Sequence, residues 1–219
     1  MTSASNDPEP VAIPRRERFE AYYSAGSPPW EIGRPQAAFL GIADRIVGRV
    51  LDIGCGTGEL AMWLAARGRT VTGIDCLETP IREARRRSIE RGVEVTFLQM
   101  DALAVGQLPE RFDVVTDCGL FHAFDDADRV RYVVALRDLL EPGAKAFILC
   151  MSDAEPGEHG PRRVSQRELR ASFTDGFVVE SIESVRFEMM SGSHGLEFSP
   201  GGAHALLGCI RRIQTTSGS

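Results

Sequence analysis

The sequence predicts an α/β fold, with a mostly parallel β-sheet, helices on both faces and an antiparallel hairpin at the C-terminal end. From about Arg49 the chain alternates short apolar runs with helical patterns, which is typical of a parallel sheet. Glycines at 54, 56 and 58 make a turn between the first apolar run and the first helical pattern. Two late strand-like segments are joined by the glycine-rich "SGSHGLEFSPGG", as in a hairpin.

The first elements are predicted to be strands at 49–54 and 70–75 and helices at 59–68 and 79–92. The strands are the segments "RVLDIG" and "TVTGID", each followed by one of the helical patterns. In the second helix Thr79 is a candidate N-cap and Pro80 suits the first turn, while Gly92 is a typical stop.

Later strands are predicted at 93–101, 112–118 and 144–152, and the hairpin strands at 177–190 and 204–212. A helical pattern at 126–143 separates the predicted strands at 112–118 and 144–152. It places Val130, Val133, Leu136 and Leu140 on the inward face and ends in Pro-Gly.

Composition limits the domain count and the range of partners. The chain has 219 residues, 43% of them hydrophobic, and a net charge of -6. This length suits one domain at about 49–213, with an N-terminal arm at 15–48 and loosely ordered tails at 1–14 and 214–219. The acidic balance disfavours nucleic acid or an anionic membrane as the partner.

The N-terminus and the cysteines indicate a cytoplasmic protein. The chain contains no apolar run long enough to span a bilayer, and its N-terminus has no apolar core of a secretory signal. Its five cysteines are widely spaced and include no CxxC pair, which argues against a zinc site and against a disulfide framework.

The glycine turn favours a ligand without phosphates. A P-loop requires Lys-Ser or Lys-Thr after the last glycine, and neither follows here. A dinucleotide fingerprint requires a third glycine at position 59, where the chain has Glu59, whose charge would repel a pyrophosphate.

Acidic residues follow the next two strands. Asp75 ends the second predicted strand, so its carboxylate is placed to accept hydrogen bonds from the two hydroxyls of a ribose. Asp101 and Ala102 end the third and could flank an adenine ring. An adenosine held without phosphates among acidic residues suits a cationic cofactor.

These segments resemble the successive motifs of class I S-adenosylmethionine (SAM)-dependent methyltransferases, namely "VLDIGCGTG", "GID", "QMDA" and "FDVVTDCGLFH". The resemblance covers about 50–152 and implies a Rossmann-like sheet of seven strands. It also implies SAM as the cofactor, S-adenosylhomocysteine as the product, and no metal. The site residues that it implies are Asp52, Gly54, Cys55 and Gly56 at the methionine part, Asp75 and Cys76 at the ribose, Asp101 and Ala102 at adenine, and Cys118 near the sulfonium.

The N-terminal "YYSAGSPPWEIGRPQAAF" resembles the lead-in of thiopurine and halide methyltransferase-like enzymes, and of actinobacterial enzymes that methylate heterocycles or quinones. The resemblance implies that this arm folds over the cofactor. Trp30 would then stack near the sulfonium, Tyr22 and Tyr23 would wall the pocket, and Gln36 would contact cofactor or substrate. The alternative is that Trp30 only packs the arm onto the domain and that the tyrosines lie on the surface.

Methyl transfer is an in-line displacement that requires alignment more than acid–base chemistry. Where the acceptor must lose a proton, His122 and His159 are candidate bases, with a structural role and a solvated loop as the respective alternatives. Arg162 and Arg163 could meet an anionic substrate or lie in a solvated loop.

Three functions remain in view. The first is methylation of an N, O or S atom of a small aromatic or heterocyclic molecule. The second is a macromolecular methyltransferase, which the acidic charge and "DCGL" in place of an NPPY-type motif disfavour. The third is a SAM-binding protein without catalysis. The sequence leaves the oligomeric state open.

Overall fold

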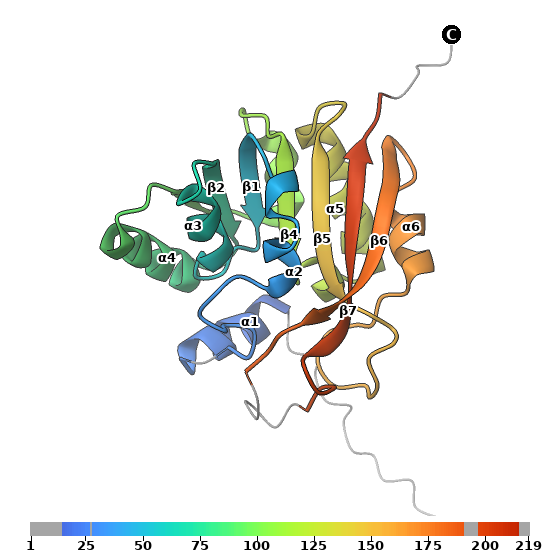
Figure 1. Ribbon diagram of the computed structural model, residues 1–219, viewed down its shortest axis with the longest axis horizontal. Coiled ribbons are helices and arrows are strands. Elements are labelled where there is room, and N and C mark those ends of the chain that lie inside the picture. Colours follow the sequence, from blue (N-terminus) through green and yellow to red (C-terminus); the bar gives the residue numbers. More distant parts are fainter. Residues whose placement is uncertain (1–14, 27, 191–196, 215–219) are drawn as a thin grey trace, which may run out of the picture.

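The computed structural model describes residues 15–26, 28–190 and 197–214. Within these residues, seven strands form one sheet in the order β3-β2-β1-β4-β5-β7-β6 (Figure 1). The strands are β1 (Arg49–Ile53), β2 (Thr70–Asp75), β3 (Thr96–Gln99), β4 (Val114–Cys118), β5 (Lys145–Met151), β6 (Phe177–Phe187) and β7 (Ala203–Arg212). The expected tail at 1–14 and residues 215–219 of the C-terminal tail lie outside the described residues.

The sheet is parallel from β3 through β5 and antiparallel at its C-terminal side. β1 pairs in parallel with β2 and β4, and β4 pairs in parallel with β5. β7 runs antiparallel to both β5 and β6, with Gly208 opposite Ile148 on one side and Ile182 on the other. The predicted fold class is therefore confirmed. The first half of the predicted hairpin connection, 191–196, lies outside the described residues.

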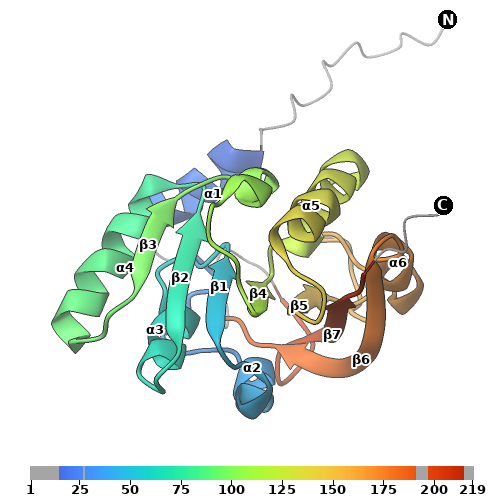
Figure 2. The same ribbon diagram turned by 90° about the horizontal axis from the view of Figure 1, so that it is seen from above.

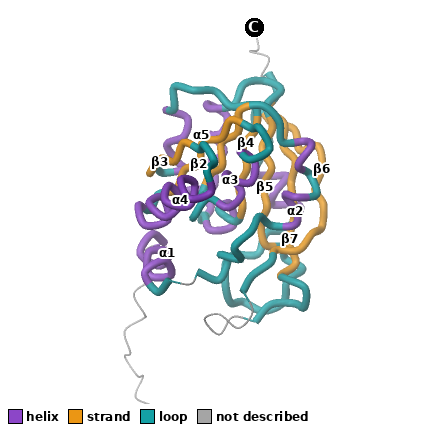
Figure 3. Tube along the Cα trace, turned by 60° about the vertical axis from the view of Figure 1, so that its left-hand side comes forward, coloured by secondary structure: helices purple, strands orange, loops and turns teal. Residues whose placement is uncertain are grey.

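Helices cover both faces of the sheet, as seen from above in Figure 2. One face carries α2 (Ala37–Leu40), α3 (Glu59–Ala65) and α4 (Glu78–Arg91), and the other carries α5 (Asp126–Leu139) and α6 (Gln166–Ser172). α1 (Arg15–Ser24) lies apart from both layers, below the carboxyl ends of the strands and next to α4 (Figure 3). No described helix is both long and apolar enough to cross a membrane.

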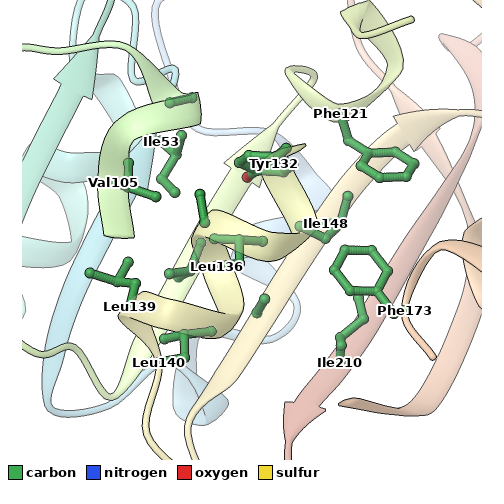
Figure 4. Close-up of a cluster of buried hydrophobic side chains, with 14 of the residues drawn as sticks. Ile53, Val105, Phe121, Tyr132, Leu136, Leu139, Leu140, Ile148, Phe173 and Ile210 are labelled. Atoms are coloured by element: carbon green, nitrogen blue, oxygen red, sulfur yellow. The ribbon is translucent and has the colours of Figure 1, made fainter. Parts of the chain in front are cut away.

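Two hydrophobic cores follow from the alternation of side chains along the strands. Val50 and Val114 face the core under α2 and α3, whereas Leu51 and Val115 face the core under α5. Figure 4 shows the second of these cores, in which Tyr132 and other side chains of α5 pack toward the central strands.

Two details of the predicted helices are wrong. Val130 does not face inward and is 65% exposed, because the buried face of α5 runs through Arg129, Tyr132, Leu136 and Leu139. Thr79 is not the N-cap of α4, because that helix already begins at Glu78. The predicted stop at Gly92 is confirmed, with a left-handed φ of 62°.

Candidate active site

Two adjoining cavities lie beyond the carboxyl ends of the central strands. The larger has a volume of about 730 Å³ and the smaller of about 70 Å³. Gly54, at the end of β1, and Cys118, at the end of β4, line both cavities. β1 and β4 are neighbours in the sheet, although the strands that follow each of them in sequence lie on opposite sides. Ligands of open α/β sheets bind at such a switch point.

The glycine turn between β1 and α3 requires its glycines. Gly54, Gly56 and Gly58 have φ values of 68°, 54° and 82°, which other residues rarely adopt. A Cβ at Gly58 would also lie 2.6 Å from Cζ of Phe97, so the close approach of this turn to β3 excludes a side chain. Cys55 and Gly56 line the smaller cavity.

Asp75 joins the glycine turn to the end of β2. Its carboxylate accepts hydrogen bonds from the backbone N–H of Gly56 at 3.1 Å and of Leu77 at 3.0 Å. Burial raises the pKa of Asp75, while these two donors oppose the rise. Both Asp75 and its neighbour Cys76 line the larger cavity.

Asp101 and Ala102 form the far wall of the larger cavity, after β3. Asp101 is the N-cap of the 3₁₀ helix Ala102–Gln107, and its carboxylate accepts a hydrogen bond from the Leu103 N–H at 2.9 Å. The structure therefore brings together the acids after β2 and β3 that the sequence predicts to share one site.

Asp52 lies deeper, at the floor of the smaller cavity, with 2% of its surface exposed. Burial raises its pKa to about 7, although the Thr116 hydroxyl donates a hydrogen bond to Asp52 at 2.8 Å and opposes the shift. A positive charge placed near Asp52 would therefore stabilise its ionised form.

The loop after β4 is held by Asp117, a residue that sequence reasoning missed. Its buried carboxylate accepts hydrogen bonds from the N–H of Leu120 at 2.8 Å and of Phe121 at 3.2 Å, and from the Tyr132 hydroxyl at 2.9 Å. Burial raises the pKa of Asp117 to about 6. Since Cys118 and Leu120 line the larger cavity, Asp117 fixes one of its walls.

Aromatic residues of the N-terminal arm cover the site. Trp30 donates a hydrogen bond from Nε1 to the Tyr23 hydroxyl at 3.2 Å, and its ring meets those of Phe19, Tyr22 and Tyr23 edge-on at 5.4, 5.1 and 6.0 Å. Phe19 and Tyr23 line the larger cavity and Trp30 lines the smaller. Tyr22 lines neither cavity and supports the cluster by its contact with Trp30.

Two polar residues of the arm connect it to the end of β6. The Gln36 amide donates to the backbone carbonyl of Glu188 at 2.8 Å and accepts from its N–H at 2.7 Å, so both ends of the amide are already occupied. Arg34 binds the Glu188 carboxylate through two hydrogen bonds, at 3.0 and 2.7 Å. Gln36 and Arg34 both line the smaller cavity, and Arg34 is the basic residue among its described lining. Sequence reasoning missed Arg34, because its role depends on Glu188, which lies far away in the sequence.

His122 is not placed with these residues. It is buried and lines neither cavity, and its Nδ1 accepts a hydrogen bond from the Met151 N–H at 2.9 Å. Burial lowers its pKa to about 3, with Arg163 and Arg129 adding to the effect. The neutral ring therefore carries its proton on Nε2, and this geometry favours the structural role over the base expected from the sequence.

No residue of the loop after β5, 152–164, lines either cavity. His159 is exposed and contacts the Glu197 carbonyl. Arg162 binds Asp126 and Glu168, whereas Arg163 donates to backbone carbonyls of its own loop, among them those of Glu155 and Pro161. Neither arginine is therefore available to an anionic substrate in this arrangement. His194, the other loop histidine, lies outside the described residues.

Across the described part of the chain, no group of three or more His, Cys, Asp or Glu side chains is arranged to hold a metal ion.

Comparisons with known proteins agree with this geometry. Residues 50–143 match the family model described as a methyltransferase domain. The chain is 34% identical over 200 residues to the 2-heptyl-1-hydroxyquinolin-4(1H)-one methyltransferase of Mycobacteroides abscessus. This match covers 86% of each protein. It is 35% identical, with a TM-score of 0.81, to a protein solved in a study of the conversion of a disulfide bond into a thioacetal group during echinomycin biosynthesis. That match covers 92% of this chain and 94% of the other.

A more distant structure shares the fold. The 1,6-didemethyltoxoflavin-N1-methyltransferase of Burkholderia thailandensis, solved with bound 1,6-didemethyltoxoflavin and S-adenosylhomocysteine, is 20% identical with a TM-score of 0.67. The match covers 96% of this chain and 99% of that protein.

Proposed function

Because this chain belongs to the SAM-dependent methyltransferase family, we propose that it methylates an N, O or S atom of a small aromatic or heterocyclic molecule. The observation that carries the proposal is the pair of cavities at the switch point, with acids at the wall and floor and an aromatic arm above. Relatives that resemble the whole chain support the substrate class, since the one from M. abscessus is named for a hydroxyquinolone.

In this proposal the larger cavity takes the adenosine part of SAM. Asp75 accepts hydrogen bonds from the ribose hydroxyls, with Cys76 beside it, and Asp101 and Ala102 border the adenine. The position of these residues on the walls of a single cavity of about 730 Å³ supports the assignment.

The smaller cavity takes the amino-acid end, lined by Asp52, Gly54, Cys55 and Gly56. Charge complementarity supports this arrangement, because the floor carboxylate of Asp52 suits the ammonium group and the Arg34 guanidinium suits the carboxylate. Arg34 would exchange its present partner, Glu188, for the cofactor. Gly54 and Cys118, which line both cavities, would then lie near the sulfonium.

SAM supplies a methyl group on a good leaving group, so the protein mainly aligns the acceptor and excludes water. We assign these tasks to residues 15–48 as a lid over a catalytic domain at 49–213. Tyr23 and Trp30, which line the two cavities, give the lid an aromatic inner surface that suits a flat apolar acceptor, and Tyr22 supports Trp30 from behind. We infer a cytoplasmic enzyme, which the five free cysteines support.

The test begins with calorimetric titration of S-adenosylhomocysteine into the protein. A screen for transfer of labelled methyl from SAM follows, with quinolones, phenols, thiols and halide as acceptors. We expect binding, with turnover on an aromatic or heterocyclic acceptor. Turnover on a protein or nucleic acid and not on small molecules would contradict the proposed substrate class. Absence of binding would contradict the assignment of the cavities.

A further inference from the structure

A second groove lies between α5 and α6, on the face of the sheet opposite α3. It has a volume of about 490 Å³, and its described lining shares no residue with the two cavities of the candidate active site. Figure 2 shows the two helices on the same face of the sheet, with α6 beside the edge strand β6 and α5 nearer to β4 and β5. Grooves of this size are large enough for a small organic ligand.

Arg129, in the first turn of α5, lines this groove and is only 5% exposed. Its Nε and Nη2 atoms have no hydrogen-bond partner among the described residues. The guanidinium packs over the Phe121 ring at 4.5 Å, and its nearest ion pair is long, 3.9 Å from Nη1 to Oε1 of Glu168. A buried charge with so little compensation is costly and calls for an explanation.

The acidic residues around the groove are held by other groups. Oε1 of Glu168 accepts a hydrogen bond from Arg162 at 2.7 Å, and Oε2 accepts from the N–H and the hydroxyl of Ser165, both at 2.9 Å. Asp126 also binds Arg162. Asp175 binds Arg137 at 2.5 Å. Arg129 is therefore the groove's least compensated charge. The lining as a whole is balanced, with three arginines and three acids, so an anion is favoured at the position beside Arg129.

The wall beside Arg129 is apolar. Val130 and Val134 of α5 are 65% and 39% exposed, and both line the groove together with Val133. Exposed valines on one helix face, next to a poorly paired cation, match a ligand that is anionic at one end and apolar along its body.

We propose that the α5–α6 groove binds a small organic carboxylate with an apolar body, whose carboxylate pairs with Arg129 and whose body lies on Val130, Val133 and Val134. The site is separate from methyl transfer. It nevertheless adjoins the cofactor wall, because Arg129 packs on Phe121 and the Phe121 N–H is held by the same Asp117 that fixes the loop after β4.

The test is calorimetric titration of sodium octanoate into the full-length protein, with octanamide as the neutral probe of nearly the same shape. We expect octanoate to bind at least about tenfold more tightly than octanamide, because the carboxylate makes a charge-assisted hydrogen bond that the amide lacks. Arg129→Met, which keeps an apolar contact with Phe121, should abolish this preference. Arg131→Met is the matched control, since Arg131 is exposed on the same helix and outside the described lining.

Val134→Glu is a second variant. It should leave the fold intact, because Val134 is already partly exposed. It should weaken octanoate binding about tenfold or more, through like-charge repulsion and loss of apolar wall. Three outcomes would overturn the proposal: no binding of octanoate by the wild type, equal affinity for octanoate and octanamide, or wild-type binding by both Arg129→Met and Val134→Glu.

Discussion

At the scale of single residues, the site depends on carboxylates kept out of water. Asp52 and Asp117 are both buried, and burial raises the pKa of Asp52 to about 7 and that of Asp117 to about 6. A folded-state pKa above the unfolded value means that the folded protein binds more protons between the two values. Stability therefore falls as the pH rises through that window, and is lowest above it.

Asp52→Asn should accordingly stabilise the protein at alkaline pH. Asparagine can still accept the Thr116 hydrogen bond but carries no charge, so the expected gain at pH 8 is on the order of 2–4 kcal/mol. The gain should shrink steadily as the pH falls below 7. Urea unfolding of both proteins from pH 5 to 8.5 measures it, and a difference that does not vary with pH would contradict the pKa assigned to Asp52. The same variant should bind S-adenosylhomocysteine more weakly.

Asp75→Ala should weaken binding of S-adenosylhomocysteine by about a hundredfold, since a charge-assisted pair of hydrogen bonds to the ribose contributes about 3 kcal/mol. The fold should persist, because Leu77 lines the larger cavity and Gly56 the smaller, so the two N–H groups that lose their acceptor lie beside open space. Calorimetry provides the affinity, and Glu94→Ala, an exposed change before β3, serves as control. Wild-type affinity in Asp75→Ala would refute the ribose assignment.

At the scale of elements, the loop after β4 is shaped by hydrogen bonds from three groups to one side chain. Asp117→Leu leaves the N–H groups of Leu120 and Phe121 and the Tyr132 hydroxyl without their acceptor. We expect a loss of about 2–4 kcal/mol in unfolding free energy, together with weaker S-adenosylhomocysteine binding. Asp117→Asn, which keeps an acceptor oxygen, should recover most of the affinity. Equal affinity in the leucine variant and the wild type would show that the loop holds its shape without Asp117.

The elements also show what could be predicted from the sequence. β2 occupies the predicted residues, 70–75, because a short segment with the β-branched apolar residues Val71 and Ile74, bounded by Gly68 before it and a helical pattern after it, is typical of a strand. The glycine turn could be predicted equally well, since positive φ values leave few alternatives to glycine. By contrast, the inward face of α5 includes Arg129 and excludes Val130, a choice made by packing against Phe121 and not by hydrophobicity.

The candidate site could be predicted only in part, because packing and distant partners again decide what local patterns do not show. Asp75, Asp101 and the glycines follow strands, and strand ends locate a site in this fold class. The roles of His122, Gln36 and Arg34 depend on partners far away in sequence, such as Met151 and Glu188, and local patterns carry no trace of them.

At the scale of the whole molecule, the site joins distant parts of the chain. The arm reaches the glycine turn through Tyr23 and Glu31, whose carboxylate accepts a hydrogen bond from the Thr57 hydroxyl and lies 3.5 Å from the Arg87 guanidinium. The same arm reaches the end of β6 through Gln36 and Glu188. Cofactor binding should therefore affect both the arm and the C-terminal part of the sheet.

Trp30→Ala should release α1 from the domain, because the rings of Phe19, Tyr22 and Tyr23 on α1 all contact the Trp30 ring. We expect faster tryptic cleavage at Arg16 and Arg18, and less protection by S-adenosylhomocysteine than in the wild type. Mass spectrometry of the early fragments measures both. Trp63→Ala, on α3 and outside the aromatic cluster, is the matched control. Unchanged cleavage in Trp30→Ala would mean that the aromatic cluster does not hold the arm.

The placement of β7 between β5 and β6 has a consequence for how the protein is made. β6 precedes β7 along the chain, yet it reaches the sheet only through β7. While the chain is still emerging from the ribosome, the half that carries the glycine turn can assemble, but β5 retains one unpaired edge and β6 two until Ala203–Arg212 has emerged. A nascent chain arrested before these residues would carry the residues that line the two cavities together with these unpaired strand edges, and would depend on chaperones to avoid aggregation.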